Sequence, residues 1–174
     1  MNFEPCEQFD WMLKCRDYKD VTSTCKRRKI AAIIPNRGNG PLSYIGSNNP
    51  TGSLHCCSRD KGICPAIHAE VDVVIKAKTQ VILSTELYLW AETPCHQCLS
   101  FIRRHSFIDT VYCLTTESYG SEYPLVLDRK EEIAFRDEYA KSINLTIVKL
   151  DREEILEYEL LKRKYVQQVQ SESN

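Results

Sequence analysis

Two short runs of the sequence, His68-Ala69-Glu70 and Pro94-Cys95-His96-Gln97-Cys98, carry residue types that bind metals and move protons. The spacing of Cys95 and Cys98 is typical of zinc ligands, and His68 would be a third protein ligand. Three protein ligands leave the fourth tetrahedral position open for water, which distinguishes a catalytic zinc from a closed structural one. Because zinc lowers the pKa of such a water toward roughly 7, these runs predict hydrolytic chemistry at neutral pH.

Glu70 follows the candidate ligand His68 by two residues, so its carboxylate can lie beside the open position without binding the ion. This placement suits a group that carries protons between water and substrate. Each run also has an ordinary explanation, because a lone Cys-x-x-Cys pair occurs in structural zinc half-sites and redox pairs, and His-x-Glu arises by chance. The proline directly before Cys95, together with both runs in one chain, favours a catalytic zinc site.

The pattern of apolar residues and chain breakers predicts the elements that position these runs. The first two strands form a hairpin, and the order strand, helix, strand at the end of the chain implies a parallel crossover. Both runs then lie at helix N-termini, where the helix dipole favours anionic thiolates. The expected fold is α/β, with a five-stranded mixed sheet between helices and its last two strands parallel. Strands are expected at 29–35, 42–46, 86–91, 109–115 and 145–150, and helices at 4–23, 65–78, 94–104, 129–141 and 152–168.

Length and composition limit the class of protein. The chain of 174 residues suits a single domain, 1–174, with a full core. Its net charge of -1 gives no general basic surface, so we expect a small substrate and no long nucleic acid. We expect neither a membrane span nor a secretory signal, because no run is apolar enough and the first residues are not basic. Nine cysteines, at least two of them metal ligands, indicate a reduced, cytoplasmic setting.

Two further features each allow two interpretations. The basic run Lys26-Arg27-Arg28-Lys29 is either a solvated surface or a phosphate contact, because it leads into a strand expected beside the metal. We take Arg27 as the candidate substrate contact in this run. The last helix is either a packed surface helix with a solvated face or a binding surface for a partner. Its apolar residues are Ile155, Leu156, Tyr158, Leu160, Leu161 and Tyr165.

With these residues placed, the chain resembles the cytidine and deoxycytidylate deaminase superfamily, and within it the deoxycytidylate deaminases of phages and bacteria. The pattern H-x-E followed by P-C-x-x-C is the signature of zinc nucleobase deaminases. The resemblance runs from about Cys25 to Thr115. Besides the two runs, it includes the basic run with its strand to Ile34, the turn Gly46-Ser47-Asn48-Asn49-Pro50, the pair His55-Cys56 and the strand start Val111-Tyr112.

The resemblance implies a three-layer α/β/α fold of the cytidine-deaminase type and assigns roles to five residues. It implies that His68, Cys95 and Cys98 bind a catalytic Zn2+. It also implies that Glu70 is the proton shuttle and that Asn48 contacts the sugar or base of the substrate.

The chain departs from the family's pattern away from the metal. Ala31 stands in place of a strand Gly, Ser47 and Asn49 replace Tyr and Gly in the turn, and Val71-Asp72-Val73 is unusual after the His-Ala-Glu run. These positions lie where the family handles its substrate and regulatory nucleotide. The resemblance therefore supports the chemistry more firmly than the substrate.

A second, structural zinc is implied by the same resemblance, because some phage members bind one through cysteines that match Cys25 and Cys56. His55, Cys57 and Cys64 lie close by in the sequence and could complete a closed site. The alternative is that these cysteines are small buried hydrophobic residues.

The function that these observations favour is zinc-dependent hydrolytic deamination of a cytosine nucleotide, dCMP to dUMP plus ammonia. One alternative is a deaminase of another base or nucleotide, such as a modified cytosine or a tRNA adenosine. Another is a zinc-stabilised binding module without catalysis, although such a module would have no use for Glu70. By resemblance we also expect a closed homo-oligomer, from dimer to hexamer.

Overall fold

The computed structural model describes residues 3–25, 28–36, 43–50, 66–78, 84–122 and 129–172. They form a five-stranded sheet of order β2-β1-β5-β6-β7 and a separate two-stranded sheet, β3-β4. The strands are β1 (Ala31–Pro35), β2 (Ser43–Ser47), β3 (Asn49–Pro50), β4 (Ala66–Ile67), β5 (Glu86–Leu89), β6 (Thr110–Leu114) and β7 (Thr146–Leu150). The helices are α1 (Glu7–Thr22), α2 (Ala69–Lys78), α3 (His96–His105), α4 (Thr116–Glu122), α5 (Lys130–Ser142) and α6 (Arg152–Glu172).

The large sheet is mixed, as predicted. β1 is antiparallel to both neighbours, with Ala32 opposite Gly46 of β2 and Leu89 of β5. β5, β6 and β7 are parallel, with Val111 of β6 opposite Leu87 and Ile147. The predicted parallel pairing of the last two strands is confirmed. The β5–β6 pair is parallel as well, because α3 lies between these strands in the chain and serves as the crossover.

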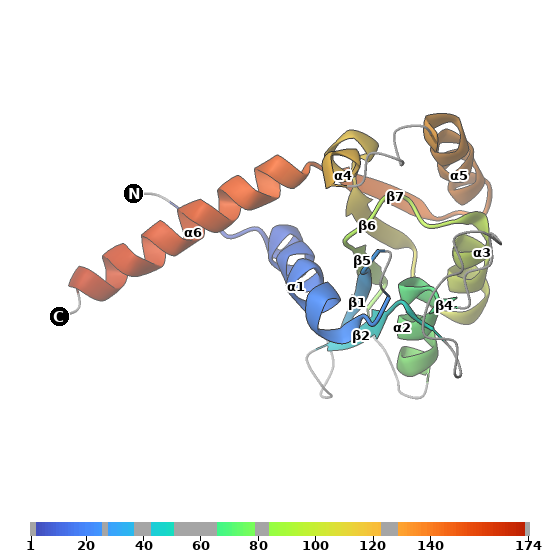
Figure 1. Ribbon diagram of the computed structural model, residues 1–174, viewed down its shortest axis with the longest axis horizontal. Coiled ribbons are helices and arrows are strands. Elements are labelled where there is room, and N and C mark those ends of the chain that lie inside the picture. The colour runs from blue at the N-terminus through green and yellow to red at the C-terminus, as the bar shows by residue number, and fades with distance from the viewer. Residues whose placement is uncertain are drawn as a thin grey trace.

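Helices cover both faces of the sheet and give the three-layer α/β/α arrangement (Figure 1). On one face α2 packs on β2 and β1, and α3 packs against α2 and α5. On the other face α1 packs on β1 and β5, and α6 contacts α1. All five residues of β1 are buried because both faces are covered. Trp90, Tyr88, Tyr119 and Met12 are the largest fully buried side chains of the core.

The helix predicted at 65–78 starts later than the sequence suggested. Ala66 and Ile67 pair with Pro50 and Asn49 as β4 and β3, and α2 begins only at Ala69. His68 lies between strand and helix, and its carbonyl accepts hydrogen bonds from the N–H groups of Val71 and Asp72. A pairing with a segment distant in the sequence thus overrides the local helical pattern.

Further differences from the prediction concern α3, α4 and α6. α3 begins at His96 rather than Pro94, because Cys95 is its N-cap. α4, Thr116–Glu122, was not predicted, since this polar segment has little apolar periodicity although Tyr119 is fully buried. α6 continues to Glu172, beyond the predicted end at 168.

Gly46 lets α2 lie directly against β2. A Cβ atom at this position would lie 2.3 Å from the carbonyl oxygen of Ala69 and 2.4 Å from the backbone nitrogen of Val73. A glycine in a strand often marks such a close backbone approach. Because Glu70 lies in the same turns of α2, this contact fixes how near its carboxylate comes to the sheet.

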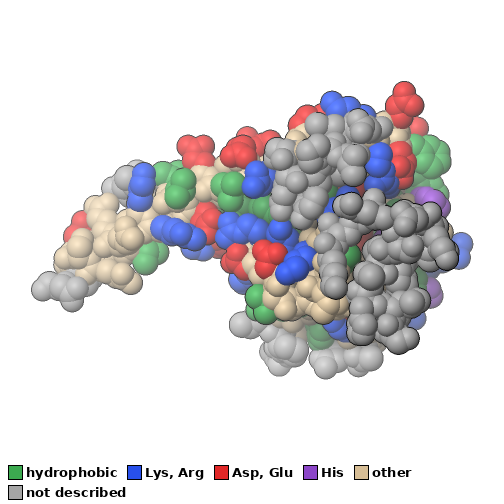
Figure 2. Space-filling view, viewed as in Figure 1, with side chains coloured by type: hydrophobic (Ala, Val, Ile, Leu, Met, Phe, Trp, Pro, Cys, Tyr) green, Lys and Arg blue, Asp and Glu red, His purple; other side chains and the backbone are tan. Residues whose placement is uncertain are grey.

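The C-terminal part of α6 extends away from the body of the domain (Figure 1). Only Ile155 and Tyr158 of this helix are buried, and the ring of Phe3 packs on Tyr158 and Tyr165 with centroid distances of 5.2 and 5.6 Å. Hydrophobic and basic side chains lie along its surface (Figure 2). Within the part of the chain that the structure describes, no helix combines the length and apolar character needed to cross a membrane.

Candidate metal centre

The sheet brings three strand ends to one edge, and the candidate metal ligands lie there. β5 leads directly into the segment that ends at Cys95. Because β1 is antiparallel to β5 and β2, the start of β1 and the end of β2 lie at the same edge. Arg28 precedes β1 and Asn48 follows β2, so residues from three separate parts of the chain line one cavity. Ligand sites at such strand ends are common in α/β folds.

His68, Cys95 and Cys98 form a compact cluster. The Nδ1 atom of His68 lies 3.2 Å from the Cys98 sulfur and 3.7 Å from the Cys95 sulfur, and the two sulfurs are 3.4 Å apart. Among the described residues, these three are the His, Cys, Asp and Glu side chains grouped closely enough to hold one metal ion.

The cluster fits zinc. Tetrahedral zinc with its usual bonds to sulfur and nitrogen separates neighbouring ligand atoms by about 3.5–3.8 Å. The observed separations lie within a few tenths of an ångström of these values, and one imidazole with two thiolates is a typical zinc donor set. Within the described ranges the cluster has three protein ligands, the number that a catalytic zinc site uses.

The thiol of Cys95 is the more acidic of the two. Cys95 is the N-cap of α3, and the hydrogen bond between its sulfur and that of Cys98 lowers its pKa well below the usual range. The adjacent Cys95 thiolate and burial raise the pKa of Cys98. Cys95 is therefore the sulfur of the pair that more readily binds a cation as a thiolate.

Glu70 lies in the first turn of α2, beside the cluster, and is almost completely buried. Burial raises the pKa of its carboxyl group above the usual range, and the electrostatic interaction with His68 opposes this shift. Glu70, His68 and Cys95 line one cavity of about 460 Å³, a size within the range of about 300–1,000 Å³ typical of small-ligand sites. The structure thus places a proton-accepting group and the metal ligands around one space.

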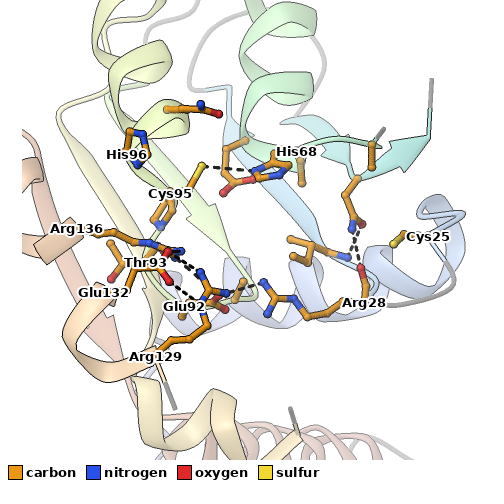
Figure 3. Close-up of a pocket in the computed structure, with 18 residues that line it drawn as sticks. Cys25, Arg28, His68, Glu92, Thr93, Cys95, His96, Arg129, Glu132 and Arg136 are labelled. Atoms are coloured by element: carbon orange, nitrogen blue, oxygen red, sulfur yellow. Dashed lines mark hydrogen bonds and ion pairs between the residues drawn. The ribbon is translucent and has the colours of Figure 1, made fainter. Parts of the chain in front are cut away.

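A row of alternating basic and acidic side chains forms another wall of this cavity (Figure 3). Arg28 donates to Glu92 at 3.0 Å, and Arg136 lies 3.9 Å from the same Glu92 oxygen. Arg136 also bonds Glu132, and Arg129 donates two hydrogen bonds of 2.7 Å to Glu132. Arg129 holds the pKa of the Glu132 carboxyl at about 2. Three guanidinium groups against two carboxylates leave a net charge of +1 on this wall.

Arg28 and Asn48 connect the basic run to this wall. The guanidinium of Arg28 lies over the ring of Tyr119 in α4, with its carbon 5.3 Å from the ring centroid. The amide nitrogen of Asn48 donates to the Arg28 carbonyl at 2.6 Å, and its oxygen accepts from the Ile30 N–H at 2.7 Å. Asn48 lines the cavity, and these bonds hold the segment that carries Arg28; its contact with the substrate stays a prediction.

The other predicted residues are only partly covered by the structure. Cys25 is buried and lines the cavity. Its suggested partners for a second zinc, His55, Cys56, Cys57 and Cys64, lie outside the described residues, as does Arg27. The second zinc and the contact by Arg27 therefore stay predictions.

Sequence reasoning missed Glu92, Arg129, Glu132 and Arg136. The signal for Glu92 was present, because it follows the apolar run Leu87–Ala91 and stands three residues before Cys95, where a buried carboxylate is unusual. The three residues on and before α5 gave no such signal. They reach the cavity because α5 packs beside α3.

The fold is shared with solved deaminase structures. No protein-family model matches the chain, and no curated protein matches it in sequence. The chain is similar to dCMP deaminase from the cyanophage S-TIM5 in its apo form, with a TM-score of 0.58, 21% identity, and coverage of 85% of this chain and 100% of that one. The same enzyme in complex with dCMP and dUMP gives a TM-score of 0.58 and 21% identity over 86% of this chain and 100% of that one. A mutant of NE0047 in complex with 8-azaguanine gives a TM-score of 0.47 at 20% identity over 90% of this chain and 80% of that one. The chain thus has the three-layer α/β/α fold of the deoxycytidylate deaminases, as its resemblance to that superfamily implied.

Proposed function

We propose that this protein is a zinc-dependent hydrolytic deaminase of a cytosine nucleotide, with dCMP as substrate and dUMP and ammonia as products. The observation that carries the proposal is Glu70, a buried carboxyl group beside a His-Cys-Cys cluster in a shared cavity. A binding module that uses zinc only for stability has no need for a buried acid there, because burying it costs free energy.

The residues of the chain divide the work of the reaction. Zinc held by His68, Cys95 and Cys98 supplies Lewis-acid chemistry that makes water a strong nucleophile at neutral pH. Glu70 takes a proton from the water that attacks C4 of cytosine and delivers it to N3. It then takes the remaining proton of the hydroxyl on C4 and passes it to the leaving amine, so that ammonia departs and the C4 carbonyl of uracil forms. The raised pKa of Glu70 suits a group that must both accept and donate.

Three observations support a nucleotide rather than a polynucleotide. The cavity volume of about 460 Å³ suits a small molecule. The arginine-rich wall offers guanidinium groups to an anion, and the chain as a whole has a net charge of -1. The cyanophage enzyme of the same fold was solved with dCMP and dUMP.

The proposal extends to metal content, setting and assembly. We propose a second, structural zinc bound by Cys25 and by ligands among His55, Cys56, Cys57 and Cys64, so metal analysis should give nearly two zinc ions per chain. A strict one-to-one ratio in reducing buffer without chelator would remove this second site. A cytoplasmic setting would keep the thiolates reduced. Self-association into a closed homo-oligomer is the remaining part of the proposal.

The test of the function is ammonia release by the zinc-loaded protein from a panel of substrates. The panel contains cytidine, deoxycytidine, CMP, dCMP, dCTP, adenosine and guanine. We expect the highest kcat/KM with dCMP. Preference for a purine, or activity only on a tRNA substrate, would support the alternative deaminases, and no ammonia from any substrate would contradict catalysis.

A further inference from the structure

Two arginines in the wall of the cavity bind a single carboxylate. Arg129 presents Nε and Nη2 to the two oxygens of Glu132, each at 2.7 Å, and Arg136 donates from Nη2 to one of the same oxygens. All three side chains line the cavity that contains His68 and Glu70 (Figure 3). A carboxylate held in this way by two guanidinium groups has the geometry with which arginines bind phosphate.

One of the two arginines, Arg136, is held in place by the core of the protein. The side chain of Arg136 is 6% exposed, and its Nη1 atom donates to the Thr93 carbonyl at 3.0 Å. Its buried Nε atom has no hydrogen-bond partner among the described residues, and neither has the buried Oε2 atom of Glu92 beside it. A buried donor without a partner costs free energy, so the site retains bonding capacity that the protein alone does not use.

The carboxylate of Glu132, by contrast, can move out of the cavity. The side chain of Glu132 is 51% exposed, so it can turn into water without breaking core contacts. Its departure would leave Arg129 and Arg136 without their nearest counter-ion at the N-terminus of α5, where the helix dipole also favours an anion. The space that Glu132 leaves therefore requires another negative group.

We propose that Arg129 and Arg136 bind the phosphate of the nucleotide, and that Glu132 is an internal substitute which this phosphate displaces. The inference rests on the proposed function for the identity of the substrate, but not for the chemistry of the anion. A nucleoside has no charge with which to replace Glu132. The exchange thus makes the cavity selective for phosphorylated substrates, and Glu132 sets how strongly a phosphate must compete.

The test compares variants of the exchanging group with a matched control. Glu132→Gln keeps the shape and removes the competing charge, so the KM for dCMP should fall several-fold, with kcat nearly constant. Glu131→Gln is the control, because it changes the net charge equally, in the same helical turn and at an exposed position. An equal fall in KM in both variants would show a general charge effect and contradict the proposal.

The arginine side is tested with Arg129→Gln. The ratio of kcat/KM for dCMP to that for deoxycytidine should fall on the order of 10- to 100-fold, as expected for a lost hydrogen bond to a charged group. Lys130→Gln is the control, since it removes a neighbouring positive charge that pairs with Glu117. Arg136→Gln should act in the same direction, and its melting temperature shows whether the buried position still folds.

Binding is measured apart from turnover, by calorimetry of the zinc-loaded protein with dCMP, deoxycytidine and inorganic phosphate. A chain that binds dCMP more weakly after Arg129→Gln but deaminates nothing contradicts the proposed function and supports the phosphate site. A chain that deaminates dCMP, but whose Glu132 and Arg129 variants change dCMP and deoxycytidine equally, contradicts the phosphate site alone. The phosphate site is also contradicted if Arg129→Gln binds both dCMP and inorganic phosphate with the same affinity as the wild type.

Discussion

Glu70 and Glu132 are carboxylates of one cavity whose surroundings shift their protonation in opposite directions. Burial raises the pKa of Glu70, whereas Arg129 and Arg136 lower the pKa of Glu132 to about 2. Glu70 is therefore the more easily protonated of the two, and Glu132 the more firmly charged. Such divergence between neighbouring acids separates a proton carrier from a charged binding group.

Glu70→Gln should retain zinc and lose nearly all turnover. The amide keeps the shape but cannot carry a proton, whose transfer contributes on the order of 100- to 10,000-fold to rate. Metal content and ammonia release, measured on the same preparation, check this. Cys95→Ala and Cys98→Ala are the contrast, because loss of a ligand should abolish both zinc binding and activity. A metal-replete Glu70→Gln variant with near-normal kcat would show that another group moves the proton.

At the scale of elements, the contact of α2 with β2 should be intolerant of one added methyl group. Gly46→Ala places a Cβ atom against the backbone of Ala69 and Val73, so α2 must move. We expect a lower melting temperature, because overpacking typically costs about 1–3 kcal/mol. We also expect weaker zinc binding, because His68 and Glu70 move with the start of α2.

The measurements are thermal unfolding and zinc affinity by competition with a chelator. Ala31→Gly, in the adjacent strand β1, is the control for a change of one methyl group without intrusion into α2. If Gly46→Ala lowers stability but leaves zinc affinity at the wild-type value, the position of α2 does not set the geometry of the ligands.

The attachment of α6 to α1 should depend on pH. Arg16 binds Glu159 with hydrogen bonds of 2.6 and 3.1 Å and lowers the pKa of this carboxyl from 4.5 to about 2. A lowered folded-state pKa stabilises the protein above the unfolded-state value, and this contribution disappears as pH falls from about 4.5 to about 2. Glu159→Gln should therefore be less stable than wild type at pH 7 and equal to it near pH 2.

Urea unfolding at several pH values measures this difference. Glu157→Gln, on the same helix, is a suitable control for the loss of one negative charge. A constant difference between Glu159→Gln and wild type from pH 7 to pH 2 would contradict a role for this ion pair in the acid transition.

Elements with a local sequence signal were predicted correctly. Elements that form only through pairing or packing with distant segments were not predicted. The run from Ala31 to Pro35 is apolar and ends in a breaker, so β1 was clear. The strand Ala66–Ile67 forms only because Asn49–Pro50 lies opposite it, and no local sequence pattern predicts this strand pairing. α4 packs through Tyr119 alone among large apolar residues, which is too little for a periodic signal.

The same distinction separates the two halves of the site. The metal ligands and Glu70 were predicted because fixed spacing in short runs carries the chemistry. Arg129 and Arg136 become part of the cavity through the sheet order, which sets α5 beside α3. Glu92, which pairs with Arg136, lies many residues away in the chain. Only the tertiary structure could reveal this group of charges.

For the whole molecule, α6 offers the surface for the proposed self-association. Its exposed side chains Leu161, Tyr165 and Val169 lie along one stripe that continues from the buried Tyr158. The segment 165–171 carries no charge, so two copies can approach without like-charge repulsion. A helix that extends into water has little stability of its own, and a second copy of α6 would provide the missing contacts.

Sedimentation at micromolar concentration should therefore show a species heavier than the 20.1 kDa chain. The double variant Tyr165→Glu with Val169→Glu should shift it to the monomer, because charge on the stripe opposes pairing. Gln167→Glu, on the opposite side of the helix, is the control. A wild-type protein that stays monomeric, or a double variant that associates normally, would exclude this surface as the site of contact.

The position of β7 at one end of the described sheet has a consequence for handling the protein at high concentration. A strand in this position presents backbone donors and acceptors that can pair with a strand of another molecule and start aggregation. The run Leu145-Thr146-Ile147-Val148-Lys149-Leu150 is rich in β-formers and contains a single charge. Lys149, which pairs with Asp137, is the one charged residue of this run, and charge on an edge strand disfavours such pairing.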